Sequence, residues 1–303
     1  MRNAFSDALV AAAVADPRVL LLTGDHGYAL FDQFRKTCPK QYINCGVAEQ
    51  NMVGVAAGLA KAGFKPVVYG LAAFVPIRVL EQIKIDVCYE NLPVILIGDG
   101  AGLVYSHLGT SHQSTEDIAC IRGIPQITIL SPADRHEMTA AMEMAFISET
   151  PVYLRMGKSD CGDVHNARIQ MRAGEMLQIR KGSIKVALFA TGSMVKTAMK
   201  IAQNGIDADI WSVPAIKPIS TSQLKKITSG TNKIITLEEH SVMGGLGSTI
   251  CELMSLENST SICRIGIEDQ FSNSCGSWDH LLHEHGLDIE SVTNKIEHFL
   301  SGS

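Results

Sequence analysis

The sequence predicts an α/β protein built from two doubly wound domains. Short apolar runs, typical of strands buried on both faces of a parallel sheet, alternate with segments of helical period. The length of 303 residues allows two cores of about 150 residues each. Between the two series of runs the pattern breaks into polar, glycine-containing sequence. We therefore place a first domain at residues 1–157, a linker at 158–182 and a smaller second domain at 183–303.

The first domain contains five apolar runs of strand length, and their alternation with helical segments indicates an open sheet covered on both faces. The runs lie at residues 19–23, 66–69, 93–98, 126–130 and 152–155. The second domain repeats the pattern with runs at 185–189, 208–213, 233–237 and 261–265. Helices are expected there after Gly192-Ser193 and after Gly245-Leu246-Gly247.

Two helices of the first domain have clear sequence signals. Apolar residues with i, i+4 spacing form one stripe, which consists of Val75, Val79, Ile83 and Val87. The sequence Ser131-Pro132-Ala133-Asp134 predicts the start of another helix. We expect the serine to cap it, the proline to lie in the first turn, and the aspartate to face the positive end of the dipole.

Composition excludes several classes of protein. A net charge of -5 and a pI of about 6.1 provide no basic surface for nucleic acid. No apolar run approaches the roughly 20 residues of a membrane span, and the first residues lack the apolar core of a signal peptide. The eight cysteines show no metal-binding spacing, which favours reduced core thiols. We expect a cytoplasmic protein with no metal site of its own.

A carboxylate at the start of a helix of small residues is the strongest functional signal. Glu49 lies in Gly46-Val47-Ala48-Glu49-Gln50-Asn51-Met52, and the helix continues through residues 53–60. Burial of a polar group costs several kcal/mol unless something bonds to it. Gly54 and Gly58 leave room for another backbone or a flat ring nearby. The alternative is an ordinary acidic residue at a helix N-terminus.

This stretch resembles a motif of the transketolase family, in which glycine, isoleucine or valine, and any residue precede glutamate and then glutamine or histidine. The resemblance continues through residues 69–74, 91–94, 109–113, 131–134 and 153–155, and into Gly244-Gly245-Leu246-Gly247. It covers all 303 residues but only the last two of the family's three domains. It implies a domain that binds the pyrimidine of thiamine diphosphate, followed by a transketolase C-terminal domain.

The resemblance implies cofactor contacts for three residues. Glu49 matches the carboxyl group that bonds to the pyrimidine nitrogen and promotes the shift of the cofactor's amino group to an imine. Phe74 matches the aromatic residue that stacks on the pyrimidine, although a phenylalanine among apolar residues is typically core. Arg78 lies where family members with two subunits often have arginine, and the alternative is a solvated side chain.

Substrate contacts are expected from the loops. His112 lies on a glycine-containing loop after a strand, and it matches the family histidine that bonds sugar hydroxyls. His107 is a weaker second candidate, and either histidine could simply be exposed. Arg155 matches an arginine that holds the sugar phosphate, with a strand-end salt bridge as the alternative. Asp25 and His26, in the loop Asp25-His26-Gly27-Tyr28, offer further polar contacts.

Two departures from the family pattern indicate altered substrate recognition. Leu108 stands where the family usually has aspartate, and Gly100 stands where a second phosphate-holding residue is expected. An unphosphorylated, a deoxygenated or a nucleotide-linked sugar would each be compatible with these losses.

The diphosphate of the cofactor requires another polypeptide. Gly98-Asp99-Gly100 resembles the start of the family's diphosphate motif, but the asparagine that completes the magnesium site about 25–30 residues later is missing. The resemblance therefore implies that an N-terminal, diphosphate-binding transketolase subunit holds the Mg²⁺. We expect the two subunits to form an α2β2 assembly, which the C-terminal domain helps to dimerise.

We therefore predict the β-like subunit of a split transketolase, which transfers a two-carbon ketol unit from a ketose to an aldose, with sugars or sugar phosphates as substrates. A second interpretation is a subunit of a decarboxylating enzyme, either a 2-oxoacid dehydrogenase or a relative of deoxyxylulose phosphate synthase. Ala48-Glu49-Gln50 and Ser111-His112-Gln113 differ from the dehydrogenase patterns and favour transketolase. A third is a non-catalytic binding or regulatory module that kept the fold.

Overall fold

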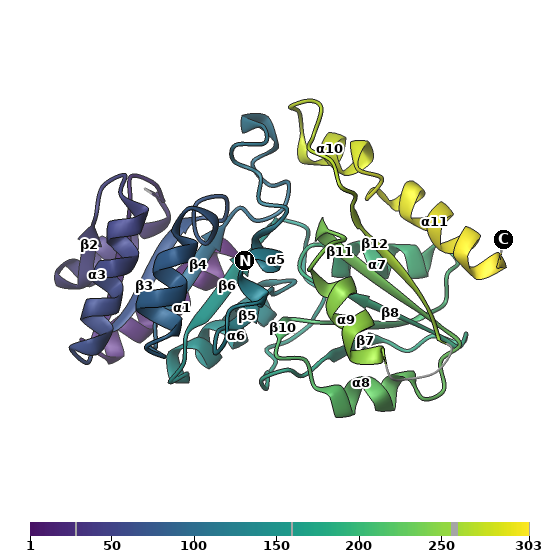
Figure 1. The fold of residues 1–303 in the computed structure, drawn as a ribbon, viewed down its shortest axis with the longest axis horizontal. Coiled ribbons are helices and arrows are strands. Elements are labelled where there is room, and N and C mark those ends of the chain that lie inside the picture. Colours follow the sequence, from purple (N-terminus) through teal and green to yellow (C-terminus); the bar gives the residue numbers. More distant parts are fainter. Residues whose placement is uncertain (28, 159, 256–259, 303) are drawn as a thin grey trace.

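The computed structural model describes residues 1–27, 29–158, 160–255 and 260–302, and it contains two parallel-type sheets side by side (Figure 1). Helices cover both sheets, so the predicted α/β class with two doubly wound domains is confirmed. Nine predicted strands are all present, within a few residues of their expected bounds. In the part of the chain described, no helix combines the length and the apolar character needed to cross a bilayer.

The first sheet has seven strands in the order β10-β5-β6-β4-β3-β1-β2. All neighbours are parallel except β10, which runs antiparallel to β5. The strands are β1 (Val19–Thr23), β2 (Tyr42–Asn44), β3 (Lys65–Leu71), β4 (Ile95–Asp99), β5 (Thr128–Leu130), β6 (Val152–Met156) and β10 (Ala215–Lys217).

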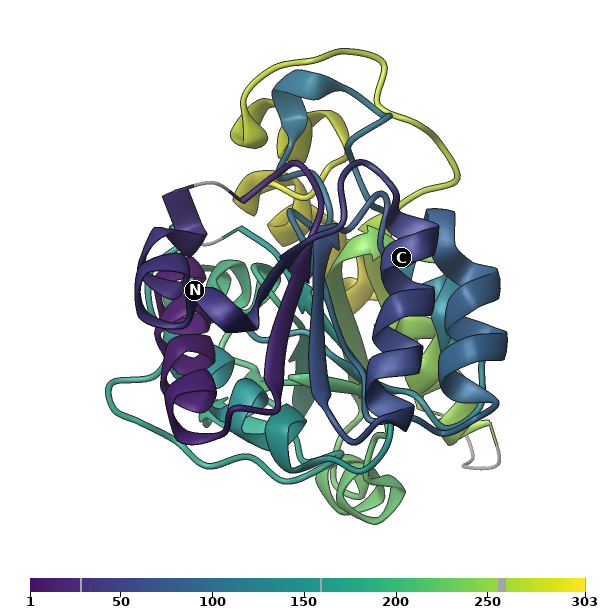
Figure 2. The same ribbon diagram turned by 90° about the vertical axis from the view of Figure 1, so that its left-hand side faces the viewer.

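Both faces of this sheet are buried, which explains why its strands are continuously apolar. Along β1, Leu20 and Leu22 enter one core cluster, whereas Val19 and Leu21 enter another. One face packs against α1 (Arg2–Ala15), α2 (Asp32–Thr37) and α6 (Arg135–Ile147). The opposite face packs against α3 (Glu49–Lys61), the helical segment at residues 77–88 and α5 (Asp117–Arg122). Figure 2 shows the two helical layers on either side of the sheet.

The predicted apolar stripe is buried, but its helix is irregular. Val75, Val79, Ile83 and Val87 are fully buried. The segment begins with a 3-10 turn (Ile77–Val79), continues through α4 (Leu80–Gln82) and becomes a π-helix (Ile83–Cys88). The wider turn brings the amide of Tyr89 to the carbonyl of Lys84, at 2.9 Å. The stripe therefore identified the buried face correctly, whereas the spacing alone did not reveal the π-helical turn.

The start of α6 corrects the predicted cap. Asp134, rather than Ser131, is the N-cap, and its Oδ1 accepts hydrogen bonds from the amides of His136 and Glu137. Ser131 instead directly follows β5, where its amide donates to the carbonyl of Pro214 at 2.7 Å and extends the pairing with β10. A serine whose backbone is occupied by strand pairing cannot start a helix, so the next strong capping residue does so.

The second sheet has five strands in the order β12-β11-β8-β9-β7, and only β7 is antiparallel to its neighbour. The strands are β7 (Leu177–Arg180), β8 (Val186–Ala190), β9 (Asp209–Ser212), β11 (Lys233–Ser241) and β12 (Ser261–Ile267). The helices are α7 (Met194–Gln203), α8 (Thr221–Thr228), α9 (Leu246–Met254), α10 (Trp278–Glu284) and α11 (Ile289–Ser301). Strand β7 lies inside the range predicted as a linker.

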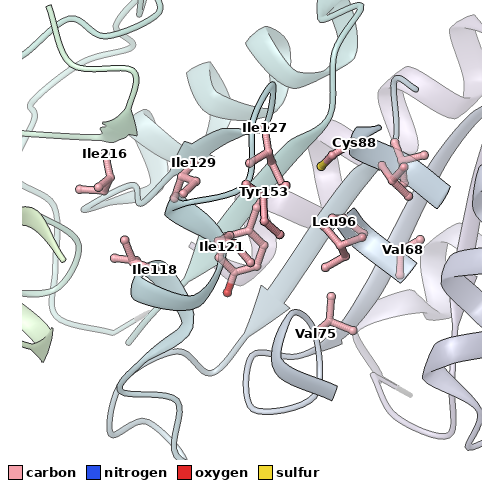
Figure 3. Close-up of a cluster of buried hydrophobic side chains, with 14 of the residues drawn as sticks. Val68, Val75, Cys88, Leu96, Ile118, Ile121, Ile127, Ile129, Tyr153 and Ile216 are labelled. Atoms are coloured by element: carbon pink, nitrogen blue, oxygen red, sulfur yellow. The ribbon is translucent and has the colours of Figure 1, made fainter. Parts of the chain in front are cut away.

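The core is continuous across the two domains. One hydrophobic cluster extends from Leu20 in β1 to Met254 in α9. Figure 3 shows part of this cluster, with Ile118 and Ile129 of the first domain near Ile216 of β10. The two sheets therefore share buried apolar surface as well as the pairing of β10 with β5.

Close packing between β4 and β6 generates a test of the fold. A Cβ atom at Gly98 would lie 2.3 Å from the hydroxyl of Tyr153, which donates to Asp117 at 2.8 Å. We expect Gly98→Ala to lower the free energy of unfolding by about 1–3 kcal/mol, because the tyrosine would have to move. Urea unfolding measures this change. Gly157→Ala is the control, since nothing lies within 4 Å of its Cβ position; equal stability losses in both variants would contradict this account.

Candidate active site

The loops after β1, β3 and β4 meet at the carboxyl edge of the first sheet. Thr23 at the end of β1 pairs with Tyr69, and Leu71 at the end of β3 pairs with Asp99. Open α/β sheets bind their ligands at this edge. Most of the predicted site residues lie in these loops or at the start of α3.

Glu49 is the first residue of α3, and its side chain is buried. The unpaired amides of the first helical turn and the helix dipole favour a carboxylate there. Nη1 of Arg78 donates to Oε2 of Glu49 at 3.0 Å. The arginine side chain is 46% exposed, whereas that of Glu49 is 6% exposed. The expectation of a carboxylate shut away from water is therefore confirmed, and its partner is a cation that faces solvent.

Four predicted site residues form one chain of contacts, which we call the Glu49 set: Glu49, Arg78, Phe74 and His112. The guanidinium carbon of Arg78 lies 4.1 Å from the centre of the Phe74 ring. The His112 ring meets the Phe74 ring edge-on, with 5.5 Å between centroids and 65° between planes. Helix α3, the loop after β3 and the loop after β4 thus bring a carboxyl group, an aromatic face and an imidazole together.

The loop after β1 lies at the same edge but outside the Glu49 set. Nε2 of His26 lies 3.2 Å from the carbonyl oxygen of Tyr69, and its ring is 5.6 Å from the Tyr69 ring. Asp25 is exposed on this loop. Tyr28, the last residue of the loop quoted from the sequence, falls outside the described residues. The roles of Asp25 and His26 toward substrate remain predictions.

His107 lines a cavity that does not include His112. It is exposed and lines a cavity of about 640 Å³ between the domains, together with Lys158, Lys196 and Trp278. The structure therefore separates the two histidine candidates, and it includes only His112 in the Glu49 set.

Two tyrosines that the sequence analysis did not single out hold Asp99 at the end of β4. The hydroxyls of Tyr69 and Tyr105 donate to Oδ2 of Asp99 at 2.6 and 2.8 Å. Burial, followed by the nearby Asp99 carboxylate, raises the pKa of both tyrosines well above their usual range, so both keep the protons that they donate. The Tyr105 ring also explains Gly100, because a Cβ there would lie 1.9 Å from a ring carbon.

Arg155 lies outside the Glu49 set. It is buried, and its Nε donates to Oδ2 of Asp117 at 2.9 Å while its Nη2 donates to the carbonyl of Glu239 at 2.8 Å. The hydroxyl of Tyr153 donates to the same Asp117 carboxylate. Arg155 therefore forms a salt bridge at the end of a strand, which was the alternative to a phosphate contact. Nothing in the local sequence indicated Asp117 as the partner.

The Glu238-Glu239-His240 segment at the end of β11 is buried where the domains meet. Oε1 of Glu239 accepts from the amide of Leu103 at 2.7 Å and from the indole of Trp278 at 3.0 Å. Burial raises the pKa of Glu238 to about 7 and lowers the pKa of His240 to about 4. Glu239 thus connects β11 to Leu103 in the loop after β4, whereas Glu238 accepts from the amides of Leu246 and Gly247 within the second domain.

Comparisons with known proteins agree with this arrangement. The family model of the transketolase pyrimidine-binding domain matches residues 1–163, and that of the transketolase C-terminal domain matches residues 174–292. The chain is 33% identical over 305 residues to a Phocaeicola vulgatus protein named as one of the subunits of an apulose-4-phosphate transketolase, covering 99% of this chain and 97% of that one.

Two further similarities extend this comparison. The chain is 34% identical over 305 residues to the 1-deoxy-D-xylulose-5-phosphate synthase of Chlorobium luteolum, covering 97% of this chain but 48% of that protein. A solved structure described as a split gene transketolase, inactive beta4 tetramer, has a TM-score of 0.88 and 32% identity, with 99% of this chain and 97% of that one covered.

The contrast between two arginines can be tested by unfolding. Arg155→Leu leaves Asp117 charged and buried, so we expect a loss of about 3–5 kcal/mol in the free energy of unfolding. Arg78→Leu removes a half-exposed partner and should cost less than about 1 kcal/mol. Denaturant titrations of both variants measure the difference. A small effect of Arg155→Leu would argue against a structural role for Arg155.

Proposed function

Since this chain belongs to the transketolase family, we propose that it is the subunit that carries the pyrimidine-binding and C-terminal domains of a split, thiamine diphosphate-dependent transketolase. Both domains match along the chain. The relative from Phocaeicola vulgatus is almost the same length and is itself named as a transketolase subunit. The Glu49 set is the observation that carries the proposal, because its chemistry fits the pyrimidine half of the cofactor.

The residues of the Glu49 set fit an aminopyrimidine ring in three ways. The buried carboxyl group of Glu49 would share a proton with a ring nitrogen, in a low-dielectric site where such a bond is strong. Phe74 would supply a stacking face. The guanidinium of Arg78 lies over the Phe74 ring and pairs with Glu49. This half-exposed side chain would turn toward solvent when the pyrimidine ring binds.

When bound, thiamine diphosphate supplies the nucleophilic carbon that carries a two-carbon unit between sugars. This chain's own contribution is to hold protons and orient groups. Glu49 would hold the proton at the pyrimidine nitrogen. Oγ of Ser111 lies 3.0 Å from Nδ1 of His112, so Nε2 of His112 is the atom we assign to a sugar hydroxyl.

We propose a ketose donor and an aldose acceptor, either sugars or sugar phosphates, in a specialised pathway. The name of the Phocaeicola vulgatus relative includes apulose-4-phosphate, which supports this class. For Arg155 we propose the structural role described above in place of a substrate contact, because its donors bond inside the protein. The similarity to 1-deoxy-D-xylulose-5-phosphate synthase keeps a decarboxylating reaction as the second candidate. Release of carbon dioxide from pyruvate by the purified pair would favour it.

We further propose that a partner subunit binds the diphosphate and Mg²⁺, and that two copies of each subunit assemble as α2β2 in the cytoplasm. Helix α3 offers a surface for the partner beside Glu49. Val47 is 75% exposed and Val55 is 36% exposed. Nothing lies within 4 Å of the Cβ positions of Gly54 and Gly58. Another backbone can therefore approach this side of the helix closely.

Substitution of Glu49 tests the catalytic proposal. In the reconstituted pair, we expect Glu49→Gln and Glu49→Ala to lower kcat for two-carbon transfer by about 100-fold or more, because the proton at the pyrimidine nitrogen is lost. A coupled assay with ketose donor and aldose acceptor measures kcat. Glu81→Gln, an exposed glutamate of α4, is the matched control. Unchanged activity of Glu49→Ala would support the non-enzymatic interpretation.

Substitution of Gly58 tests the partner surface. The position is exposed in this chain and its Cβ would meet nothing, so Gly58→Leu should preserve or raise the melting temperature of the isolated subunit. Affinity for the partner should fall by about tenfold or more, since an added side chain would hold the two backbones apart. Calorimetric titration measures it. Ala11→Leu, exposed on α1, is the control; equal affinities for both variants would refute this docking surface.

A further inference from the structure

The loop that carries His112 is held from both domains. Its base closes where Gly102 and Ser114 exchange two backbone hydrogen bonds, at 2.8 and 2.9 Å. The amide of Ser241 in β11 donates to the carbonyl of Thr115 at 2.7 Å. In Figures 1 and 2 this loop rises beside the loop that joins β12 to α10. A segment of the C-terminal domain therefore lies next to the active-site loop.

A chain of side-chain hydrogen bonds, which we call the relay, connects these two loops through Gln113, Ser272 and His285. Oγ of Ser272 donates to Oε1 of Gln113 at 2.8 Å, and Nε2 of His285 lies 2.9 Å from the same hydroxyl. The hydroxyl has one hydrogen, which the amide oxygen accepts, so Nε2–H of His285 must be the donor to Oγ. Burial lowers the pKa of His285 and favours the neutral ring. Gln113 is 5% exposed and His285 is 4% exposed, so water does not compete freely for these bonds.

The residues of the relay also line one small cavity. Gln113 and His285 both line a cavity of about 20 Å³, together with Thr110 and Thr115. Among the described residues, Nε2 of Gln113 and Nδ1 of His285 have no hydrogen-bond partner.

The Ser272 end of the relay is itself fixed to α10. The amide of Asn273 donates to Oε1 of Glu284 at 2.5 Å, and Oγ of Ser274 donates to Oε2 of Glu284 at 2.6 Å. Sγ of Cys275 lies 3.1 Å from the Cβ position of Gly109, whose φ of +75° also favours glycine. The segment that contacts the loop with His112 is therefore itself held in place by hydrogen bonds to α10.

We propose that Ser272 and His285 are positioning residues that hold His112 in the active site through Gln113. Gln113 follows His112 directly, so fixing its side chain restrains the backbone that carries the imidazole. The restraint keeps the His112 ring edge-on to Phe74, 5.5 Å between centroids. This inference rests on the proposed function only where it concerns catalysis. The C-terminal domain thereby supports the site without touching substrate.

Kinetics of the reconstituted pair test the catalytic part. We expect Ser272→Ala to lower kcat by about tenfold, because small displacements of a catalytic group are costly, while the Kd for thiamine diphosphate changes less than about twofold. Ser272→Thr, which keeps the hydroxyl, should restore kcat. In a His112→Ala background, Ser272→Ala should have less than about a twofold effect. An equal loss in both backgrounds would overturn the proposal, since it would show that Ser272 does not act through His112.

Hydrogen exchange of the subunit tests the restraint without any activity. Ser272→Ala should raise amide exchange in residues 104–116, whereas Ser272→Thr should not, and neither should the control Asn273→Ala, which keeps the backbone amide that bonds to Glu284. A second comparison uses two variants of His285. His285→Leu removes the donor to Ser272, whereas His285→Gln supplies an amide N–H close to the position that Nε2 occupies. Unchanged exchange in Ser272→Ala and His285→Leu would overturn the proposal. A wild-type pair that lacks two-carbon transfer would instead refute the proposed function, and the exchange result would still decide the restraint.

Discussion

The buried ion pair between Asp117 and Arg155 fixes the junction on which the rest of the molecule depends. It joins the first residue of α5 to β6, and Arg155 also donates to the carbonyl of Glu239 in β11. Removing both charges from water is costly unless every lone pair and proton finds a partner. Tyr153 and the backbone carbonyls supply those partners. The network contacts both sheets and therefore holds them in one relative position. Arg155 also donates to the carbonyl of Ser114, so the same network helps to position the loop after β4.

The candidate site follows from two simpler constraints. Parallel strands end at one edge, so the loops after β3 and β4 must lie close together. A helix start favours a negative charge, so Glu49 can be held in the wall of the site. Its partner Arg78 faces solvent and is therefore replaceable, whereas the carboxylates farther inside bond to tyrosines, amides or Arg155. The carboxylate that we propose for catalysis therefore differs from the structural ones in the exposure of its partner.

Local sequence pattern predicted the buried strands and the buried faces of the helices, because each depends on the periodicity of neighbouring residues. It missed β2, β7 and β10, which are short and lie near sheet edges, and it misplaced the cap of α6. The Glu49 set came from a family resemblance, and its four members do meet. The environment of Arg155 was not predictable in this way, since its partners at positions 117 and 239 are distant in sequence. Tyr69, one of the two tyrosines on Asp99, was missed for the same reason, whereas Tyr105 lies six residues from Asp99 on a loop whose course the local pattern does not reveal.

The pairing of β10 with the first sheet limits where the chain can be cut into separate domains. Strand β10 belongs to the second half of the chain but pairs with β5, at the margin of the first sheet. A polypeptide cut near residue 165 would expose an unpaired row of amides and carbonyls, of the kind that promotes aggregation. Neither domain is therefore expected to fold well when it is expressed alone or joined to an unrelated domain. A break in the chain between the two sheets would separate strands that pair in the folded protein.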